Sequence, residues 1–353
     1  MIDRNGPNGM NGDQTMRIAI NGLGRIGKLV IRAFVDEGLD AEIVLLNDVA
    51  GDAAVHAHLL EFDTVHGRWD AGLSAPDADT IALGNRRIRF TRQAALAALP
   101  LAELGVDMVV DCTGAFKTPE QLQPYFDAGV RKVVVSAPVK EGAANLVYGV
   151  NHQQDYDPAT QHIVTAASCT TNCLAPVVKV VLETFGIRHG SMTTIHDVTN
   201  TQTIVDRPHR DLRRARSALN SLIPTTTGSA TAITMIYPQL KGRLNGHAVR
   251  VPLLNASLTD CVFELERPTT AEAANAAFKA AAEGELAGIL GYEERPLVSA
   301  DYTNDTRSSI IDALSTMVVN ETQLKVYAWY DNEMGYAWRL ADVTRLVLAV
   351  LKP

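Results

Sequence analysis

The chain has 353 residues, 46% hydrophobic and 20% charged, which is typical of a globular protein with room for two domains and their cores. Its formal net charge of −8 argues against nucleic acid or an anionic membrane as the main partner, and no apolar run approaches the ~20 residues that cross a bilayer. The four cysteines do not form a disulfide framework, and Cys169 and Cys173 lack the second pair of a zinc site, so we expect no metal and a reducing, cytoplasmic location.

The first fifteen residues are rich in Gly, Asn and Asp and contain no apolar segment. They therefore lack the features of a signal peptide or a lipidation signal. We interpret residues 1–15 as a disordered N-terminal extension. Met10 and Met16 are alternative start residues, because the first predicted strand begins only at Arg17.

A glycine-rich motif follows the first strand. Residues 17–21 form an apolar run that predicts a buried strand, and Gly22, Gly24 and Gly27 then open a predicted amphipathic helix. In this GxGxxG context the first glycine makes the tight turn, the second admits a pyrophosphate, and the third lets helix and strand pack. Asp48 ends the next predicted strand, 21 residues after Gly27, where a carboxylate holds ribose hydroxyls and favours NAD over NADP.

Two further apolar runs, 107–111 and 132–135, are followed by small or hydroxylated residues. Apolar strands of this kind predict a parallel sheet, and the carboxyl ends of its strands line the crevice in which a dinucleotide binds. Thr113, Gly114 and Ser136 lie directly after these runs. They are therefore candidates for close approach to the cofactor.

The segment around Cys169 is the candidate catalytic centre. Apolar residues precede it at 163–164 and an apolar-periodic run follows it at 174–181, so the pattern predicts a strand, a polar turn and a helix. Cys169 would then lie at a helix N-terminus, where free N–H groups and the helix dipole favour the thiolate form. The hydroxyls of Ser168 and Thr170 flank it and can cap the helix or donate to an oxyanion.

Beyond this helix the pattern changes to alternating strands, typical of a mostly antiparallel sheet with one open face. One of these strands ends at His196. A polar loop with five arginines follows at 197–222, and loops of this length are usually functional or lie in an interface. A hydroxyl-rich stretch at 224–229 precedes another helix, and Arg250 lies on a strand; both features fit phosphate recognition.

Together these elements predict an α/β protein with a Rossmann-type, doubly wound NAD domain and an α+β catalytic domain built on a mostly antiparallel sheet. We expect the NAD domain at 16–168 and the catalytic domain at 169–334. A C-terminal helix at 335–353 has an apolar face suited to packing back on the NAD domain, which it would complete.

Seven motifs occur in the order found in phosphorylating glyceraldehyde-3-phosphate dehydrogenases, and the chain resembles that family from Met16 to its C-terminus. They lie at 21–27, 136–138, 168–173, His196, 212–216, 250–252 and 329–333. Seven ordered motifs are far more specific than any one of them. The resemblance implies a glycolytic type of oxidoreductase and a homotetramer with the arginine-rich loop near the subunit core.

The resemblance also implies a role for each matching residue. Cys169 would attack the aldehyde of glyceraldehyde 3-phosphate, while His196 would act as base and then hold the oxyanion. The inorganic anion would be bound by Ser168, Thr170, Arg214, Thr227 and Gly228, and the substrate's own phosphate by Thr199 and Arg250. The NAD cofactor would lie along Gly22, Gly24, Arg25, Ile26, Gly27, Asp48, Thr113, Gly114 and Ser136, with Asn332 holding its carboxamide.

The segment after His196 departs from the glycolytic pattern. The usual His-Ala-Tyr-Thr-Asn-Asp-Gln is replaced by His-Asp-Val-Thr-Asn-Thr-Gln at 196–202, which removes a tyrosine and an acidic residue. The loss of a carboxylate at Thr201 should make the pocket more favourable to anions. With variant stretches at 60–68, 224–228 and 288–296, the chain looks most like the arsenic-resistance branch. In that branch arsenate replaces phosphate, and an organoarsenical efflux permease exports the product, 1-arseno-3-phosphoglycerate.

Other readings stay open at this point. Two are enzymes: an ordinary glycolytic or gluconeogenic glyceraldehyde-3-phosphate dehydrogenase, and an erythrose-4-phosphate dehydrogenase. Arsenate and phosphate are near-isosteric, so a site of hydroxyls and arginines is expected to accept both. A non-catalytic binding protein on the same fold would not need Cys169, His196 and Asn332 together with two motif arginines. Arg207 could tolerate a 2′-phosphate on the cofactor, whereas Asp48 argues for NAD.

Overall fold

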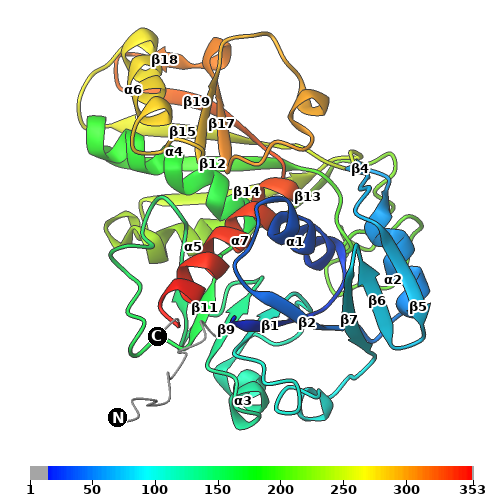
Figure 1. Ribbon diagram of the computed structural model, residues 1–353. Helices are drawn as coiled ribbons and strands as arrows, with labels where there is room; N and C mark the ends of the chain where they lie inside the picture. Colours follow the sequence, from blue (N-terminus) through cyan, green and yellow to red (C-terminus); the bar gives the residue numbers. More distant parts are fainter. Residues whose placement is uncertain (1–14, 352–353) are drawn as a thin grey trace, which may run out of the picture.

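The computed structural model describes residues 15–351, which form two large sheets with helices packed on them (Figure 1). The predicted disordered extension, residues 1–15, lies outside the described residues except for Thr15. Within 15–351, no helix is both long enough and apolar enough to cross a bilayer. The two sheets agree with the predicted fold class; the domain boundaries themselves stay a prediction.

The first sheet has nine strands, in the order β10-β11-β9-β8-β1-β2-β7-β6-β5. Its neighbours are parallel from β10 to β7, and β6 and β5 extend one edge in antiparallel pairs. The strands are β1 (Arg17–Asn21), β2 (Glu42–Asn47), β5 (Leu73–Asp77), β6 (Thr80–Leu83), β7 (Arg86–Thr91), β8 (Met108–Asp111), β9 (Lys132–Val135), β10 (Ala144–Asn145) and β11 (Ile163–Thr165). A separate hairpin joins β3 (Phe62–Asp63) to β4 (Gly67–Arg68).

Helices cover both faces of this sheet, because successive residues of its strands point to opposite sides. Ile18 and Ile20 of β1 belong to the cluster that contains α1 (Arg25–Asp36) and α7 (Met334–Ala349). Ala19, between them, belongs to the opposite cluster, which contains α3 (Pro119–Asp127). The helix α2 (Ala53–Glu61) packs on the antiparallel edge. The sheet is therefore doubly wound, as predicted.

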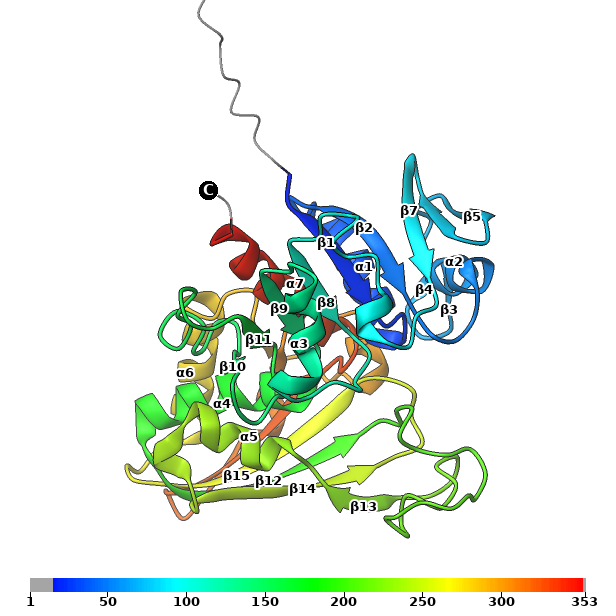
Figure 2. The same cartoon turned by 90° about the horizontal axis from the view of Figure 1, so that it is seen from below.

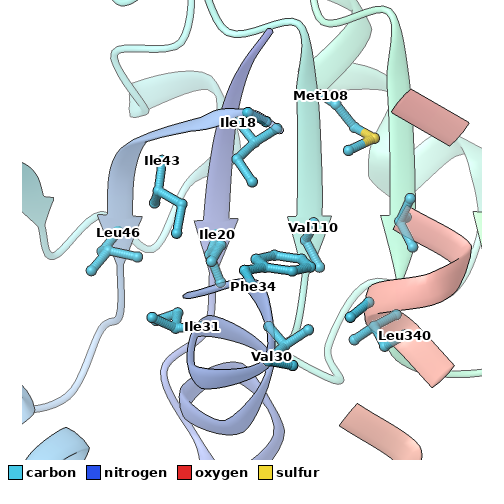
Figure 3. Close-up of a cluster of buried hydrophobic side chains, with 14 of the residues drawn as sticks. Ile18, Ile20, Val30, Ile31, Phe34, Ile43, Leu46, Met108, Val110 and Leu340 are labelled. Atoms are coloured by element: carbon cyan, nitrogen blue, oxygen red, sulfur yellow. The ribbon is translucent and has the colours of Figure 1, made fainter. Parts of the chain in front are cut away.

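Figure 3 shows the core between α1 and the sheet. Val30, Ile31 and Phe34 of α1 point toward the apolar side chains of β1, β2 and β8, and all three are buried. Leu340 of α7 closes the same cluster from the side, with no exposed surface. The last helix of the chain thus completes the core of the first sheet.

The second sheet has the strand order β13-β14-β12-β15-β19-β17-β16, with β18 paired to β19. It is mostly antiparallel, as predicted, with parallel pairs only at β12–β14 and β16–β17 among the described strands. The strands are β12 (Ile187–His196), β13 (Ile223–Thr226), β14 (Leu244–Arg250), β15 (Ser257–Leu265), β16 (Leu290–Glu293), β17 (Ser309–Asp312), β18 (Met317–Val319) and β19 (Gln323–Tyr330). Short 3-10 helices span Leu96–Ala98, Pro238–Leu240, Ser299–Tyr302 and Ala313–Ser315.

Three helices lie on the face of the second sheet that is turned toward the first (Figure 2). They are α4 (Cys169–Phe185), α5 (Ser229–Ile236) and α6 (Ala271–Glu283). The central helix, α4, begins directly after β11 of the first sheet and packs its apolar face on the second. Its N-terminus therefore lies where the two sheets approach each other. The arginine-rich stretch between β12 and β13 is a loop that extends beyond the strand ends (Figure 2).

The packing of α7 on the first sheet gives a stability prediction. Leu340→Ala is expected to lower the free energy of unfolding by roughly 2–5 kcal/mol, because it deletes a fully buried side chain and leaves a cavity. Leu314 is 63% exposed, so Leu314→Ala is a matched control with an expected cost of less than about 0.5 kcal/mol. Urea unfolding followed by tryptophan fluorescence compares the two variants. Equal costs would contradict the role of α7 in this core.

Candidate active site

The turn before α4 presents Cys169 at the start of the helix. Ala167 has a left-handed backbone (φ 52°), an unfavourable conformation for a residue with a Cβ. Its N–H donates to Thr165 Oγ1 at 3.0 Å, and its carbonyl accepts from Tyr336 Oη of α7 at 3.2 Å. Ser168 then caps α4 by accepting from the backbone N–H of Thr171. This places Cys169 at the positive end of the helix dipole, as the sequence predicts.

Cys169 faces His196, which ends β12. The distance from Cys169 Sγ to His196 Nε2 is 3.7 Å. Burial alone would raise the pKa of the thiol, but the hydrogen bond to His196 and the nearby positive charges lower it below its usual value. Burial likewise lowers the pKa of His196, yet hydrogen bonds with Asp197 and Cys169 raise it to about 9. Both shifts favour transfer of the thiol proton to the imidazole, which gives a thiolate–imidazolium pair.

Three further side chains surround this pair. Tyr330 of β19 stands edge-on to the His196 ring, and its hydroxyl lies 2.9 Å from Thr170 Oγ1. Arg250, on β14, places Nη1 2.8 Å from His196 Nδ1. The carboxylate of Asp197 lies 2.7 Å from the same ring nitrogen. Sequence reasoning noted Asp197 only as a departure from the family pattern and assigned it no contact with His196.

The other cysteines have the opposite electrostatic environment. Burial raises the pKa of Cys173 to about 12 and raises that of Cys261 well above its usual value. Burial and the neighbouring Asp111 also raise the pKa of Cys112. Cys112, like Cys169, is partly exposed. Among the described residues, however, no imidazole or arginine stabilises a thiolate at Cys112. Cys169 is therefore the one described cysteine whose pKa is lowered.

Several predicted anion ligands meet at the start of two helices. Ser168 Oγ lies 3.0 Å from Ser229 Oγ, the first residue of α5. Thr227 and Gly228 precede that helix, and Gly228 occupies its N-cap without a side-chain cap. Free N–H groups at a helix start and hydroxyls nearby are the donors that a tetrahedral oxyanion requires.

A second polar group lies in the arginine-rich loop. Arg214 donates through Nε to Thr225 Oγ1 at 3.0 Å and through Nη1 to Thr201 Oγ1 at 3.3 Å. Thr199 Oγ1 is 2.9 Å from Thr201 Oγ1, so Thr199 and Arg214 are joined through that hydroxyl. Arg250 is not part of this group, because its guanidinium lies against His196 and donates to the carbonyl of Asp197.

The glycine motif leaves room for a dinucleotide. At Gly27 a Cβ would stand 1.9 Å from the carbonyl oxygen of Gly22, and at Gly22 it would stand 2.6 Å from Thr113 N, so neither position tolerates a side chain. At Gly24, the N-cap of α1, nothing lies within 4 Å of the position a Cβ would take. A pyrophosphate therefore has open space directly over the N-terminus of α1. The residues present fit NAD.

The remaining predicted cofactor residues lie at the carboxyl ends of neighbouring strands. Asp48 follows β2, and its Oδ2 accepts from Leu23 N of the glycine motif at 2.7 Å. Thr113 and Gly114 follow β8 and Ser136 follows β9, so all three lie at the same edge of the sheet. Asn332 follows β19 and is buried, with its Oδ1 3.2 Å from Ser257 Oγ.

Arg25 and Ile26 occupy the first turn of α1, but their side chains have other partners. Arg25 forms ion pairs with Asp63 and with Glu333. Ile26 packs against the core of the first sheet. The backbone N–H groups of this turn are therefore the donors that we expect a pyrophosphate to use. His66, to which no role was assigned from the sequence, is buried with Nε2 3.0 Å from Glu333 Oε2 and joins the same network.

Comparisons with known proteins agree with this architecture. Residues 16–119 match the family model described as glyceraldehyde 3-phosphate dehydrogenase, NAD binding domain, and residues 168–332 match the C-terminal domain of the same family. The chain belongs to the glyceraldehyde 3-phosphate dehydrogenase family. It is 59% identical to glyceraldehyde-3-phosphate dehydrogenase 3 of Nostoc sp. over 96% of this chain and 99% of that protein. It is also 50% identical to glyceraldehyde-3-phosphate dehydrogenase of Geobacillus stearothermophilus over 94% of this chain and 98% of that protein.

These matches confirm four predictions: the glyceraldehyde-3-phosphate dehydrogenase family, the fold class, an NAD-dependent dehydrogenase of this type, and NAD as the cofactor. They show the family only, and the arsenic-resistance branch within it stays a prediction. The individual roles of the site residues stay predictions as well. They are supported by the distances given above.

The opposite pKa shifts of Cys169 and Cys112 give a test of selectivity. Iodoacetamide at neutral pH should alkylate Cys169 first, because only its pKa is lowered, while Cys112, which is also partly exposed, reacts far more slowly. Peptide mass spectrometry over a time course measures both sites in one sample. His196→Asn should slow labelling of Cys169 and leave Cys112 unchanged. Labelling of Cys112 at the same rate as Cys169 would contradict the activated thiolate.

Proposed function

We propose that the chain oxidises glyceraldehyde 3-phosphate with NAD through a thioester on Cys169 and releases it to phosphate as 1,3-bisphosphoglycerate. The observation that supports this most strongly is the pair formed by Cys169 Sγ and His196 Nε2 at the N-terminus of α4. Its environment lowers the pKa of the thiol and raises that of the imidazole. Such a pair is suited to covalent attack on an aldehyde carbon.

The chemistry divides between the two residues. Cys169 attacks the aldehyde carbon as thiolate, and the resulting alkoxide accepts a proton from His196 Nε2 to give the thiohemiacetal hydroxyl. Bound NAD would supply the acceptor for the hydride that leaves the same carbon. His196 removes the hydroxyl proton as the thioester forms, and Asn332 is the proposed holder of the nicotinamide carboxamide.

Anion binding completes the reaction. We assign the acceptor anion to Ser168, Thr170, Arg214, Thr227 and Gly228, which supply hydroxyls, a guanidinium and a helix N-terminus. We assign the phosphate of the substrate to Thr199 and Arg250. Arg250 lies against His196, so a substrate phosphate held there would keep the aldehyde close to Cys169.

Arsenate is a second proposed acceptor. The observation that favours it is Thr201, which stands where the glycolytic pattern has an acidic residue and accepts a hydrogen bond from Arg214. A hydroxyl there leaves the Arg214 guanidinium with Asp211 Oδ2, 3.6 Å from its Nε, and without a second carboxylate at Thr201, which helps either anion. The product with arsenate would be 1-arseno-3-phosphoglycerate, as in arsenate detoxification. The efflux permease remains a prediction that no residue of this chain tests.

The proposed assembly is a homotetramer in the cytoplasm. The arginine-rich loop exposes large apolar side chains that an isolated subunit would leave in water, namely Ile204, Val205, Leu212, Leu219 and Leu222. Clusters of exposed apolar side chains are typical of protein interfaces. All four cysteines are free thiols, which fits a reducing compartment.

Replacing His196 tests the catalytic pair. His196→Asn should lower kcat for NADH formation from glyceraldehyde 3-phosphate and phosphate by about 10²–10⁴-fold, because the general base is lost. Cys169→Ala should abolish turnover and leave NAD binding intact, which fluorescence quenching measures. Rates measured with erythrose 4-phosphate distinguish the proposed activity from that of an erythrose-4-phosphate dehydrogenase. Turnover retained by Cys169→Ala, or a higher rate with erythrose 4-phosphate, would overturn the proposal.

Restoring the acidic residue tests the anion site. Thr201→Asp should raise KM for both phosphate and arsenate by about two- to fivefold, since the new carboxylate competes for Arg214 at an exposed position. Thr201→Asn is the uncharged control of similar size. Initial rates with each anion titrated separately give both constants. Unchanged values in Thr201→Asp would place the acceptor anion away from Arg214.

A further inference from the structure

The carboxylate of Asp197 lies inside the catalytic centre. Its Oδ1 is 2.7 Å from His196 Nδ1, and the Asp197 side chain has no exposed surface. Its other oxygen, Oδ2, is buried without a hydrogen-bond partner among the described residues. A buried carboxylate is costly unless a donor or a positive charge compensates it. The imidazole of His196 is the group placed to do so.

The contacts of Nδ1 determine where the ring proton lies. This nitrogen has two acceptors near it, Asp197 Oδ1 at 2.7 Å and the Asp197 carbonyl oxygen at 2.9 Å. Arg250 Nη1 is also close, but it can donate to that carbonyl at 2.9 Å instead of to the ring. Because both of these oxygens can only accept a hydrogen bond, Nδ1 must carry the proton that it donates. In the neutral ring, Nε2 then has a free lone pair that faces Cys169 Sγ.

Consecutive residues of a strand point to opposite faces, so the sequence alone places His196 and Asp197 apart. The structure brings them together because β12 ends at His196 and Asp197 lies outside the regular strand. The N–H of Asp197 donates to Ser257 Oγ at 3.1 Å, which holds this residue against β15. Ser257 Oγ lies 3.3 Å from Asp197 Oδ1 and 3.2 Å from Asn332 Oδ1, and its single proton serves one of them at a time.

We propose that Asp197 is a positioning residue that holds the Nδ1 proton of His196 and stabilises the imidazolium formed in the reaction. This inference rests on the proposed function of the Cys169–His196 pair. In the step concerned, the proton leaves Cys169 Sγ, or later the thiohemiacetal hydroxyl, and binds His196 Nε2. The centre is then a Cys–His–Asp arrangement, in which a third group orients the base.

The charged and titratable groups around His196 explain what the carboxylate contributes. Cys169 approaches from α4, Tyr330 from β19 and Arg250 from β14. A thiolate on Cys169 favours the imidazolium, whereas the guanidinium of Arg250 opposes it at a distance of 2.8 Å. The carboxylate of Asp197 offsets that repulsion from the same side of the ring. Without it, burial and Arg250 would both favour the neutral ring and, with it, the neutral thiol.

The test removes this charge while keeping the shape of the side chain. Asp197→Asn should lower the iodoacetamide alkylation rate of Cys169 at neutral pH by about 10- to 100-fold, because Nδ1 of His196 then faces a neutral acceptor instead of a charged one. The main rise of the rate should move to higher pH. The reaction is followed on the enzyme without substrate. The value of kcat should fall similarly, with little change in KM for glyceraldehyde 3-phosphate.

Two further variants make the outcome decisive. Asp206→Asn removes an equal charge from the same loop, at an exposed carboxylate paired with Arg216, and should keep the wild-type pH profile. Asp197→Ala introduces the alanine of the glycolytic pattern. If Asp197→Asn does not fold, Asp197→Ala is measured in its place. A wild-type profile in a folded Asp197 variant would overturn this inference while leaving the proposed function in place. A wild-type enzyme that forms no NADH would instead overturn the proposed function.

Discussion

The contact between Cys169 Sγ and His196 Nε2 is the interaction on which the function of this fold depends. The two residues belong to different parts of the architecture: Cys169 begins the helix that leaves the first sheet, and His196 ends a strand of the second. Their distance is therefore set by how α4 packs on the second sheet. The buried apolar face of α4 and the left-handed turn at Ala167 together fix this geometry.

A second network joins the cofactor side of the molecule to the catalytic side. Arg25, in the first turn of α1, pairs with Glu333, the residue after Asn332. Buried His66 contacts the same carboxylate. Burial alone would lower the pKa of His66, but the hydrogen bond to Glu333 helps to raise it. The helix start proposed for the pyrophosphate and the segment proposed for the nicotinamide are thus held together by partly buried ion pairs. Breaking such a pair by removing one partner is costly, because the other charge stays behind unpaired.

The sequence predicted the fold well where local patterns and chain order were enough. The GxGxxG turn, the helix start at Cys169 and the strand that ends at His196 all lie where periodicity and capping chemistry placed them. The contact of Asp197 with His196 was not predictable in this way, because strand alternation separates neighbouring residues, and the two meet only because the regular strand ends at His196. Arg25 was assigned to the dinucleotide, but the sequence could not show that Asp63 and Glu333 occupy its guanidinium.

The most direct test of the account is the ionisation of Cys169 in the protein without substrate. Thiolate absorbance in the ultraviolet, measured against pH and corrected with Cys169→Ser, reports that single group. The account predicts that the signal is present at neutral pH and persists well below the usual pKa of a thiol, and that it is lost at neutral pH in His196→Asn. A signal that first appears near the usual thiol pKa, or one that His196→Asn does not change, would contradict the thiolate–imidazolium pair.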